Sequence, residues 1–218
     1  MKKIVERKER NIQSISLLFF FVSFIGWLFE TFVCLFQSGE LCDRGFLSLP
    51  FCPVYGAPVC VIFLLFDAPS NGLFYRLLTK KKKKSTGHGG DFYKLISVVL
   101  YFLSATLIAT GAELIVGLIL EDAGVSLWSY NGVPLCYKGV ICLPVSLFWG
   151  ALISLFAQFV LPKIEKKIIA IPKGIKTVLC IVLWTAIGID FILNWQFSLQ
   201  NGTHFDVVNY FKEWRGNK

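Results

Sequence analysis

The amino-acid sequence predicts an all-α, polytopic membrane protein: a bundle of about five transmembrane helices in a single membrane domain that covers residues 1–218. Hydrophobic residues make up 55% of the chain, and 21 Phe and 6 Trp are among them. The mean hydropathy is +0.63. Because a soluble domain is roughly 45–50% apolar, this chain carries more apolar surface than a soluble core buries, whereas a bilayer accommodates it.

Five apolar runs have the length of a spanning helix, which needs roughly 20 mostly apolar residues. They cover about 12–37, 54–78, 92–120, 143–161 and 175–199. Asp67-Ala68-Pro69 interrupts the second run, so an alternative is that its helix ends near Phe66 and that 71–78 forms a short interfacial helix. The first run follows a basic segment, as in a signal peptide. Its length, Trp27 and Glu30 favour a retained helix instead.

The distribution of charge predicts the orientation in the membrane. The net charge is +8, and 17 of the 22 Lys and Arg residues lie in three segments, 1–10, 76–94 and 163–176. The others are Arg44, Lys138 and three residues of the tail 200–218. The positive-inside rule then places the N-terminus in the cytoplasm and the C-terminus outside a bacterial plasma membrane. Membrane orientation thus accounts for the positive charge, so the bilayer is the expected partner and nucleic acid is not.

An internal repeat relates the first four runs. A shift of 94 positions aligns 41–57 with 135–151, and 7 of the 17 positions are identical. We therefore expect repeat 1 at about 12–78 and repeat 2 at about 92–161, with parallel topology, and an extra helix at about 175–199. Both outer loops are apolar but broken by Gly and Pro. Two interpretations stay open: re-entrant loops that dip in from the outer face, or external caps that lie flat on the membrane.

Each helix that precedes one of these loops carries a glutamate, Glu30 or Glu113. A charged side chain near mid-bilayer costs about 2.5–3.5 kcal/mol unless it is paired or hydrated. The nearest repeat-equivalent cations are Arg44 and Lys138. One hypothesis is that these residues form buried salt bridges that hold the loops. The other is that the carboxylates face a hydrophilic path for a cation or polar solute.

Further candidates belong to the same polar cavity. Glu121 shares a helix face with Glu113, because residues four apart lie on one side of a helix. Tyr55 and Trp149 are repeat-equivalent aromatic residues. Asp190, a third acid in an apolar run, either joins this network or serves only the packing of the fifth helix.

The cysteines and histidines indicate no metal site and no catalytic centre. Cys42 and Cys136 are repeat mates near the outer face, where a disulfide is permitted, although free buried thiols are the alternative. Neither the cysteine spacing nor a histidine supports zinc. Because HExxH, GxSxG and Walker patterns are all missing from the sequence, we assign no catalytic residue and no cofactor.

Four motifs occur in order along the chain. They are Ser23, Gly26, Trp27 and Glu30; then Asp43-Arg44-Gly45-Phe46-Leu47 with Pro50 and Pro53-Val54-Tyr55-Gly56; then Glu113, Gly117 and Glu121; then Gly139, Ile141-Cys142-Leu143, Ser146 and Trp149-Gly150. With these motifs the chain resembles the family of small bacterial membrane proteins called putative ABC-transporter type IV permeases. Ser129 stands where that family usually has Asp, so an external acid is replaced here.

The resemblance implies a permease-like protein, the membrane subunit of a transporter that moves a polar or cationic solute. Its implied partners are a separate ATPase subunit and a second copy of the chain. Two other functions fit the same residues. A non-transporting scaffold or regulatory subunit would use the charges only to hold the bundle together. An intramembrane enzyme would need a substrate beside the acids, and no catalytic constellation supports it.

Overall fold

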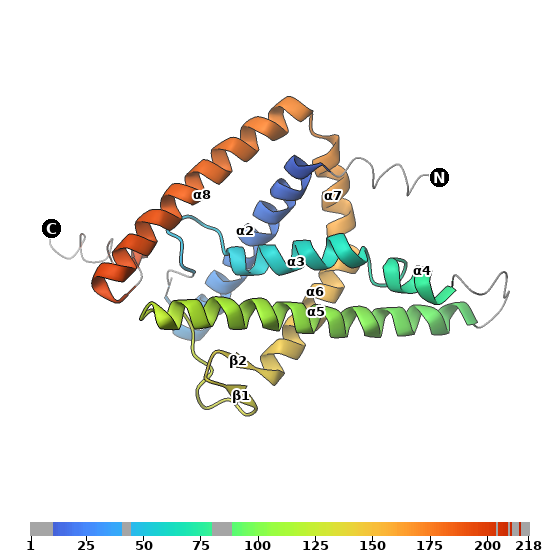
Figure 1. Cartoon of the computed structure of the whole chain (residues 1–218), viewed down its shortest axis with the longest axis horizontal. Coiled ribbons are helices and arrows are strands. Elements are labelled where there is room, and N and C mark those ends of the chain that lie inside the picture. The colour runs from blue at the N-terminus through green and yellow to red at the C-terminus, as the bar shows by residue number, and fades with distance from the viewer. Residues whose placement is uncertain are drawn as a thin grey trace.

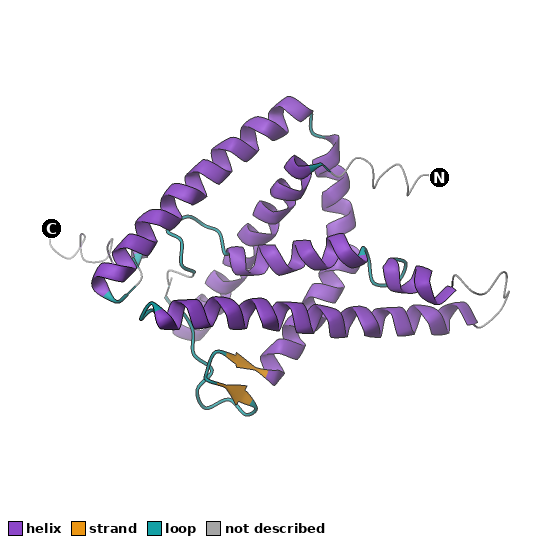
Figure 2. Ribbon diagram, viewed as in Figure 1, coloured by secondary structure: helices purple, strands orange, loops and turns teal. Residues whose placement is uncertain are grey.

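The computed structural model describes residues 11–40, 45–79, 89–203, 205–208, 210 and 214, and its fold is all-helical apart from one short hairpin (Figures 1 and 2). The helices are α2 (Ile12–Ser38), α3 (Pro53–Phe66), α4 (Leu73–Thr79), α5 (Gly89–Asp122), α6 (Leu143–Phe159), α7 (Leu161–Ala170) and α8 (Lys173–Asn201). The hairpin pairs β1 (Cys136–Tyr137) with β2 (Ile141–Cys142). The predicted all-α class is confirmed.

Local sequence signals set the ends of the long helices. α2 begins after Asn11, whose side-chain oxygen accepts a hydrogen bond from the Ser14 N–H at 2.8 Å and so satisfies a free amide of the first turn. α2 ends at Gly39 and α8 ends at Gly202, with φ of 72° and 67°. Glycine adopts this left-handed conformation without a steric cost.

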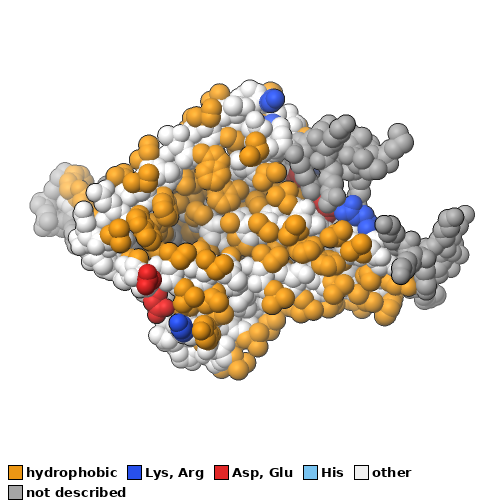
Figure 3. Space-filling model, in the orientation of Figure 1, with side chains coloured by type: hydrophobic (Ala, Val, Ile, Leu, Met, Phe, Trp, Pro, Cys, Tyr) orange, Lys and Arg blue, Asp and Glu red, His pale blue; other side chains and the backbone are white. Residues whose placement is uncertain are grey.

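Three helices, α2, α5 and α8, are long and apolar enough to cross a membrane, and α6 with α7, bent by 49°, form a fourth candidate. Large side chains on these helices stay exposed, with Leu107 at 73% and Ile192 at 64%. Figure 3 shows hydrophobic side chains over most of the visible face and charged ones near its edges. The chain is therefore a membrane protein, as predicted.

The second predicted span is shorter than its apolar run. α3 ends at Phe66 because Asp67 takes a φ of 59°, and α4 follows as a separate helix. This matches the alternative with an early end. α3 has 14 residues, about 21 Å, which is less than a hydrocarbon core of about 30 Å. The count of five full spans is thus only partly supported.

The core forms where the helix pairs α2–α3 and α5–α6 cross, around buried residues that include Ile62, Tyr101 and Ala157. Glycine is required at both crossings. A Cβ on Gly56 of α3 would lie 2.1 Å from the Ser23 Oγ of α2, and one on Gly150 of α6 would lie 1.9 Å from the Thr106 Oγ1 of α5.

The segment 45–52 runs beside the middle of α2, not beside its end. The Cys52 N–H donates to the Ser23 carbonyl at 3.0 Å. Ser23 precedes the last residue of α2, Ser38, by 15 positions, which is about 22 Å along a helix axis. α3 therefore starts from a deep position in the bundle, which accounts for its short length.

α8 packs against α2 and against the segment 45–52. The Trp184 ring stacks on Phe19 of α2, with centroids 5.4 Å apart, and Phe46 contacts Phe191 at 5.5 Å. At the other end of α8 the buried Lys176 donates to the Ser14 Oγ at 3.0 Å. The fifth predicted helix is thus anchored to α2 and to the segment 45–52.

Candidate functional site

The first intramembrane acid, Glu30 of α2, is bound by a tyrosine. Tyr55, in the first turn of α3, donates its hydroxyl hydrogen bond to Glu30 Oε1. Gly26, one helical turn before Glu30, makes room for the ring, since a Cβ there would lie 2.5 Å from the Tyr55 Cδ2. A glycine on α2 and a tyrosine at the start of α3 together place a hydroxyl on this carboxylate.

The second acid, Glu113 of α5, is also bound by a tyrosine. The Tyr130 hydroxyl donates to Glu113 Oε1 at 2.7 Å. Tyr130 belongs to the connection between α5 and β1, and its N–H donates to the Gly139 carbonyl at 2.8 Å. Burial raises the pKa of the Tyr130 phenol, and the bond to Glu113 raises it further. The hydroxyl therefore stays protonated and remains a donor.

The two pairs meet in one cluster. Glu30 lies within electrostatic range of Glu113 and Tyr130. The Trp149 ring of α6 packs on Tyr55, with centroids 4.8 Å apart. We call Glu30, Tyr55, Glu113, Tyr130 and Trp149 the acid–tyrosine cluster. It joins the C-terminal halves of α2 and α5 to the starts of α3 and α6.

The expected salt bridge between Glu113 and Lys138 is not formed. Within the described residues, the ion pairs are Asp67–Arg76 and Asp91–Lys94, both outside the cluster. Lys138 is exposed, and its Nζ lies 5.9 Å from the Tyr137 ring. A nearer hydroxyl, that of Tyr130, takes the place of the predicted cation. Arg44 lies outside the described residues, so a pair with Glu30 stays a prediction.

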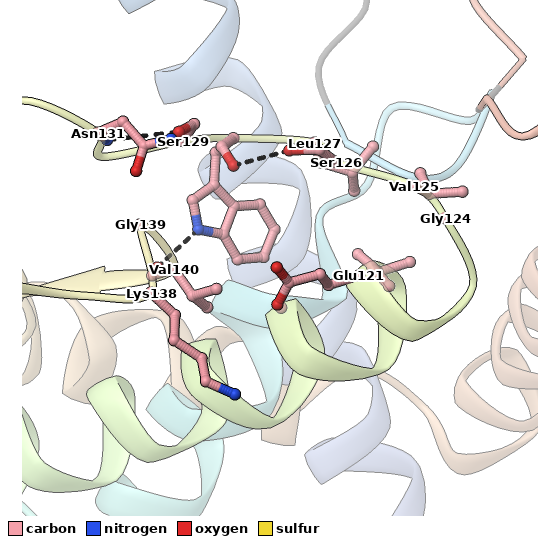
Figure 4. Close-up of a pocket in the computed structure, with 13 residues that line it drawn as sticks. Glu121, Gly124, Val125, Ser126, Leu127, Ser129, Asn131, Lys138, Gly139 and Val140 are labelled. Atoms are coloured by element: carbon pink, nitrogen blue, oxygen red, sulfur yellow. Dashed lines mark hydrogen bonds between the residues drawn. The ribbon is translucent and has the colours of Figure 1, made fainter.

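Glu121 and Lys138 line a separate hollow of about 250 Å³ next to the cluster (Figure 4). Its walls are the end of α5 and the connection that follows, with Trp128 held by a hydrogen bond of 2.9 Å to the Val140 carbonyl. Gly117 allows Val140 to approach α5, since a Cβ there would lie 2.2 Å from the Val140 Cγ1. The predicted site residues thus divide into two neighbouring groups.

Asp190 of α8 binds the segment 45–52. Its Oδ2 accepts from the Leu49 N–H at 3.1 Å, and its Oδ1 accepts from the Asn194 side chain at 3.0 Å. Asn194 also donates to the Ser48 Oγ at 3.1 Å. We considered that Asp190 either joins the acid network or serves the packing of the fifth helix. The structure favours the second role, and it adds a contact between α8 and the segment 45–52.

The predicted disulfide between Cys42 and Cys136 is not formed in this structure. Cys136 is a free thiol, and its Sγ donates to the Tyr130 carbonyl at 3.2 Å. Cys42 itself lies outside the described residues. Cys34 on α2 is disulfide-bonded, while Cys52, Cys60, Cys136, Cys142 and Cys180 form no disulfide. The pairing of β1 with β2 explains why the prediction was wrong, because it holds Cys136 close to Cys142.

Tyr130 is the residue of the acid–tyrosine cluster that sequence reasoning missed. It lies in the segment 121–134, which has no counterpart in the predicted repeat. One sequence feature could have indicated Tyr130. It is adjacent to Ser129, a position at which the chain departs from the family motif. Tyr55 was a candidate, but its partner was not predicted.

Apolar helices of this length fit a membrane protein. The chain belongs to the family described as "Putative ABC-transporter type IV", which matches residues 17–195. No curated protein and no solved structure matches the chain. The resemblance seen in the motifs is therefore confirmed by a match over most of the sequence.

Proposed function

We propose that the protein is the membrane subunit of a transporter, that its solute is cationic, and that the solute passes the acid–tyrosine cluster. The observation that carries this proposal is the pairing of Glu30 and Glu113 with hydroxyls. Each carboxylate accepts a hydrogen bond from a tyrosine hydroxyl. A carboxylate offers about four acceptor positions, so both acids keep capacity for a positively charged ligand.

Aromatic rings support the choice of a cation over a neutral solute. Trp149 packs on Tyr55 at 4.8 Å and on Phe29 at 5.3 Å. Ring faces attract cations, with Trp the strongest and about 0.5–2 kcal/mol for each contact. Two acids beside such rings favour a solute with an ammonium group.

The proposal includes the parallel repeat. Ser23 and Thr106 each precede a glutamate, Glu30 or Glu113, by seven positions. At the helix crossings, Gly56 of α3 packs against Ser23, and Gly150 of α6 packs against Thr106. The same contact at the same spacing in both helix pairs supports one duplicated unit, with the fifth helix outside it.

A re-entrant first loop supports an entry path from the outer face. The segment 45–52 lies at the level of Ser23 of α2, to which it is hydrogen-bonded through Cys52. Its Leu49 N–H donates to the Asp190 carboxylate. Backbone amides at membrane depth need such partners when no helix satisfies them. On this account the loop ends at the cluster, because Tyr55 follows Cys52 by three residues. The N-terminus is cytoplasmic and the hairpin faces outward, as the charge distribution predicts.

The family description implies an ABC transporter, and an ATPase subunit is the partner we propose at the opposite end. α4 and α7 are short helices with Arg76 and Lys167 in their last turns. α7 adjoins the start of α2, where Lys176 bonds both Ser14 and the Ile169 carbonyl. Co-purification of a tagged chain with an ATPase from its own host tests this partner.

Binding of tetramethylammonium to the purified chain, measured by titration calorimetry, tests the solute class. We expect saturable binding that weakens about 10–100-fold in Glu30→Gln or Glu113→Gln, because a bond to a charged group contributes about 1.5–3 kcal/mol. Asp91→Asn is the matched control, since Asp91 pairs with Lys94 away from the cluster. Lack of binding, or equal binding by the double Gln variant, would overturn the cationic path and leave the scaffold.

A further inference from the structure

Two free thiols face each other across the hairpin. Cys136 and Cys142 are register partners in the antiparallel pair β1–β2. The Leu143 N–H donates to the Leu135 carbonyl at 3.1 Å, so the neighbouring pair is the hydrogen-bonded one. Cys136 and Cys142 therefore form a non-hydrogen-bonded pair, in which Cα atoms lie about 4.5 Å apart. Disulfides span Cα separations of about 4.4–6.8 Å.

The two thiols differ in access. Cys136 is partly exposed, whereas Cys142 is 2% exposed. Because Cys136 and Cys142 are directly opposite in the register, their side chains lie on the same face of the hairpin. One thiol is thus open to a reagent from solution, and the other is placed to react with the first.

A third cysteine, Cys34, supports an oxidising environment at this end of the molecule. Cys34, one helical turn beyond Glu30 on α2, is disulfide-bonded. Glu30 lies within electrostatic range of Glu113 and Tyr130, and the Tyr130 carbonyl accepts from Cys136. The hairpin and the bonded Cys34 therefore share one end of the bundle. Disulfides persist on the oxidising side of a membrane.

We propose that Cys136 and Cys142 are a redox pair that forms an intramolecular disulfide on contact with an external disulfide oxidant. The Cys136 thiolate attacks the oxidant, which releases one thiol and leaves a mixed disulfide. The Cys142 thiolate then attacks the Cys136 sulfur and releases the second thiol. Two S–H bonds are lost and one S–S bond forms, and the two electrons and two protons pass to the oxidant, which becomes two thiols.

The disulfide has a local consequence for the acid–tyrosine cluster. In the reduced state the Cys136 S–H donates to the Tyr130 carbonyl, and the Tyr130 hydroxyl donates to Glu113. Oxidation removes the S–H donor and crosslinks β1 to Cys142, the last residue of β2 and the N-cap of α6. The redox state of the pair thus acts on the segment that holds the hydroxyl on Glu113.

Peptide mapping of the full-length protein in detergent tests the pair, with oxidised glutathione as the oxidant. Trypsin cuts after Lys138, which is exposed and lies between the two cysteines. The resulting peptides 95–138 and 139–163 contain one cysteine each, Cys136 and Cys142. After oxidation, alkylation and digestion without reductant, we expect these two peptides to remain joined. Dithiothreitol should separate them into singly alkylated peptides.

Two variants make the result specific. Cys142→Ser should leave peptide 95–138 unlinked, whereas Cys60→Ser, a buried cysteine of α3, should leave the linkage unchanged. The proposal is overturned if oxidised native protein yields both peptides alkylated, or only glutathionylated at Cys136. Linkage of Cys136 to any cysteine other than Cys142 would overturn it as well. The test does not depend on transport, so it stands apart from the proposed function.

Discussion

Asp190 in α8 accepts a hydrogen bond from the backbone N–H of Leu49, with 3.1 Å between Oδ2 and N. The predicted repeat aligns Leu49 with Leu143, whose N–H bonds the Leu135 carbonyl beside the hairpin. For Leu49, a carboxylate from α8 supplies the acceptor instead. This relationship gives α8 a structural role that the repeat alone does not explain.

Asp190→Leu should destabilise the protein by about 1.5–3 kcal/mol, because the partly buried Leu49 N–H loses its carboxylate acceptor. Asp190→Asn, which keeps an acceptor oxygen, should lose less. Thermal unfolding in detergent measures both, and Asn201→Ala on the same helix, an exposed position, is the control. An unchanged melting temperature in Asp190→Leu would contradict the tether.

Gly150→Ala should cost about 1–3 kcal/mol, because the added methyl group collides with Thr106 and overpacks the α5–α6 crossing. Gly56→Ala should do the same against Ser23 at the α2–α3 crossing. Gly111→Ala is the matched control, since a Cβ there meets no atom within 4 Å. Guanidinium or thermal unfolding ranks the three variants, and equal stability of all three would refute the close crossings.

Tyr130→Phe should change how stability depends on alkaline pH. The pKa of Tyr130 is raised in the folded state by burial and by Glu113, whereas an unfolded tyrosine titrates near pH 10. The folded state therefore holds this proton more tightly, and its contribution is present below about pH 10 and is lost as pH rises above it. Native protein should lose more stability than Tyr130→Phe between about pH 10 and 11. Parallel curves would contradict a buried phenol.

The helices could be predicted from the sequence because apolar runs and breaks are local signals. Asp67 and the proline that follows it mark the end of α3, and this alternative was correct. The glutamates could be found because an acid stands out in an apolar run. Their partners could not, since Tyr130 reaches Glu113 through an insertion whose path depends on tertiary packing.

Pairing between distant segments explains the other differences. Cys42 and Cys136 match in the repeat, but hairpin register, which depends on the turn at Lys138 and Gly139, places Cys142 opposite Cys136. In the same way, Asp190 looked like an isolated acid because its partner is a backbone amide 141 positions away. Every residue except proline has a backbone N–H, so the sequence does not indicate which one will bind a carboxylate.

Carbodiimide labelling tests the central claim, that a cation path from the outer face reaches the acid–tyrosine cluster. A water-soluble cationic carbodiimide with a glycine ester is added outside intact cells, and mass spectrometry maps the modified acids. We predict modification of Glu30 or Glu113, slowed by tetramethylammonium, while Asp190 with both oxygens bonded stays unmodified. Modification of these glutamates only by the membrane-soluble dicyclohexylcarbodiimide would contradict the account and show a dry, structural cluster.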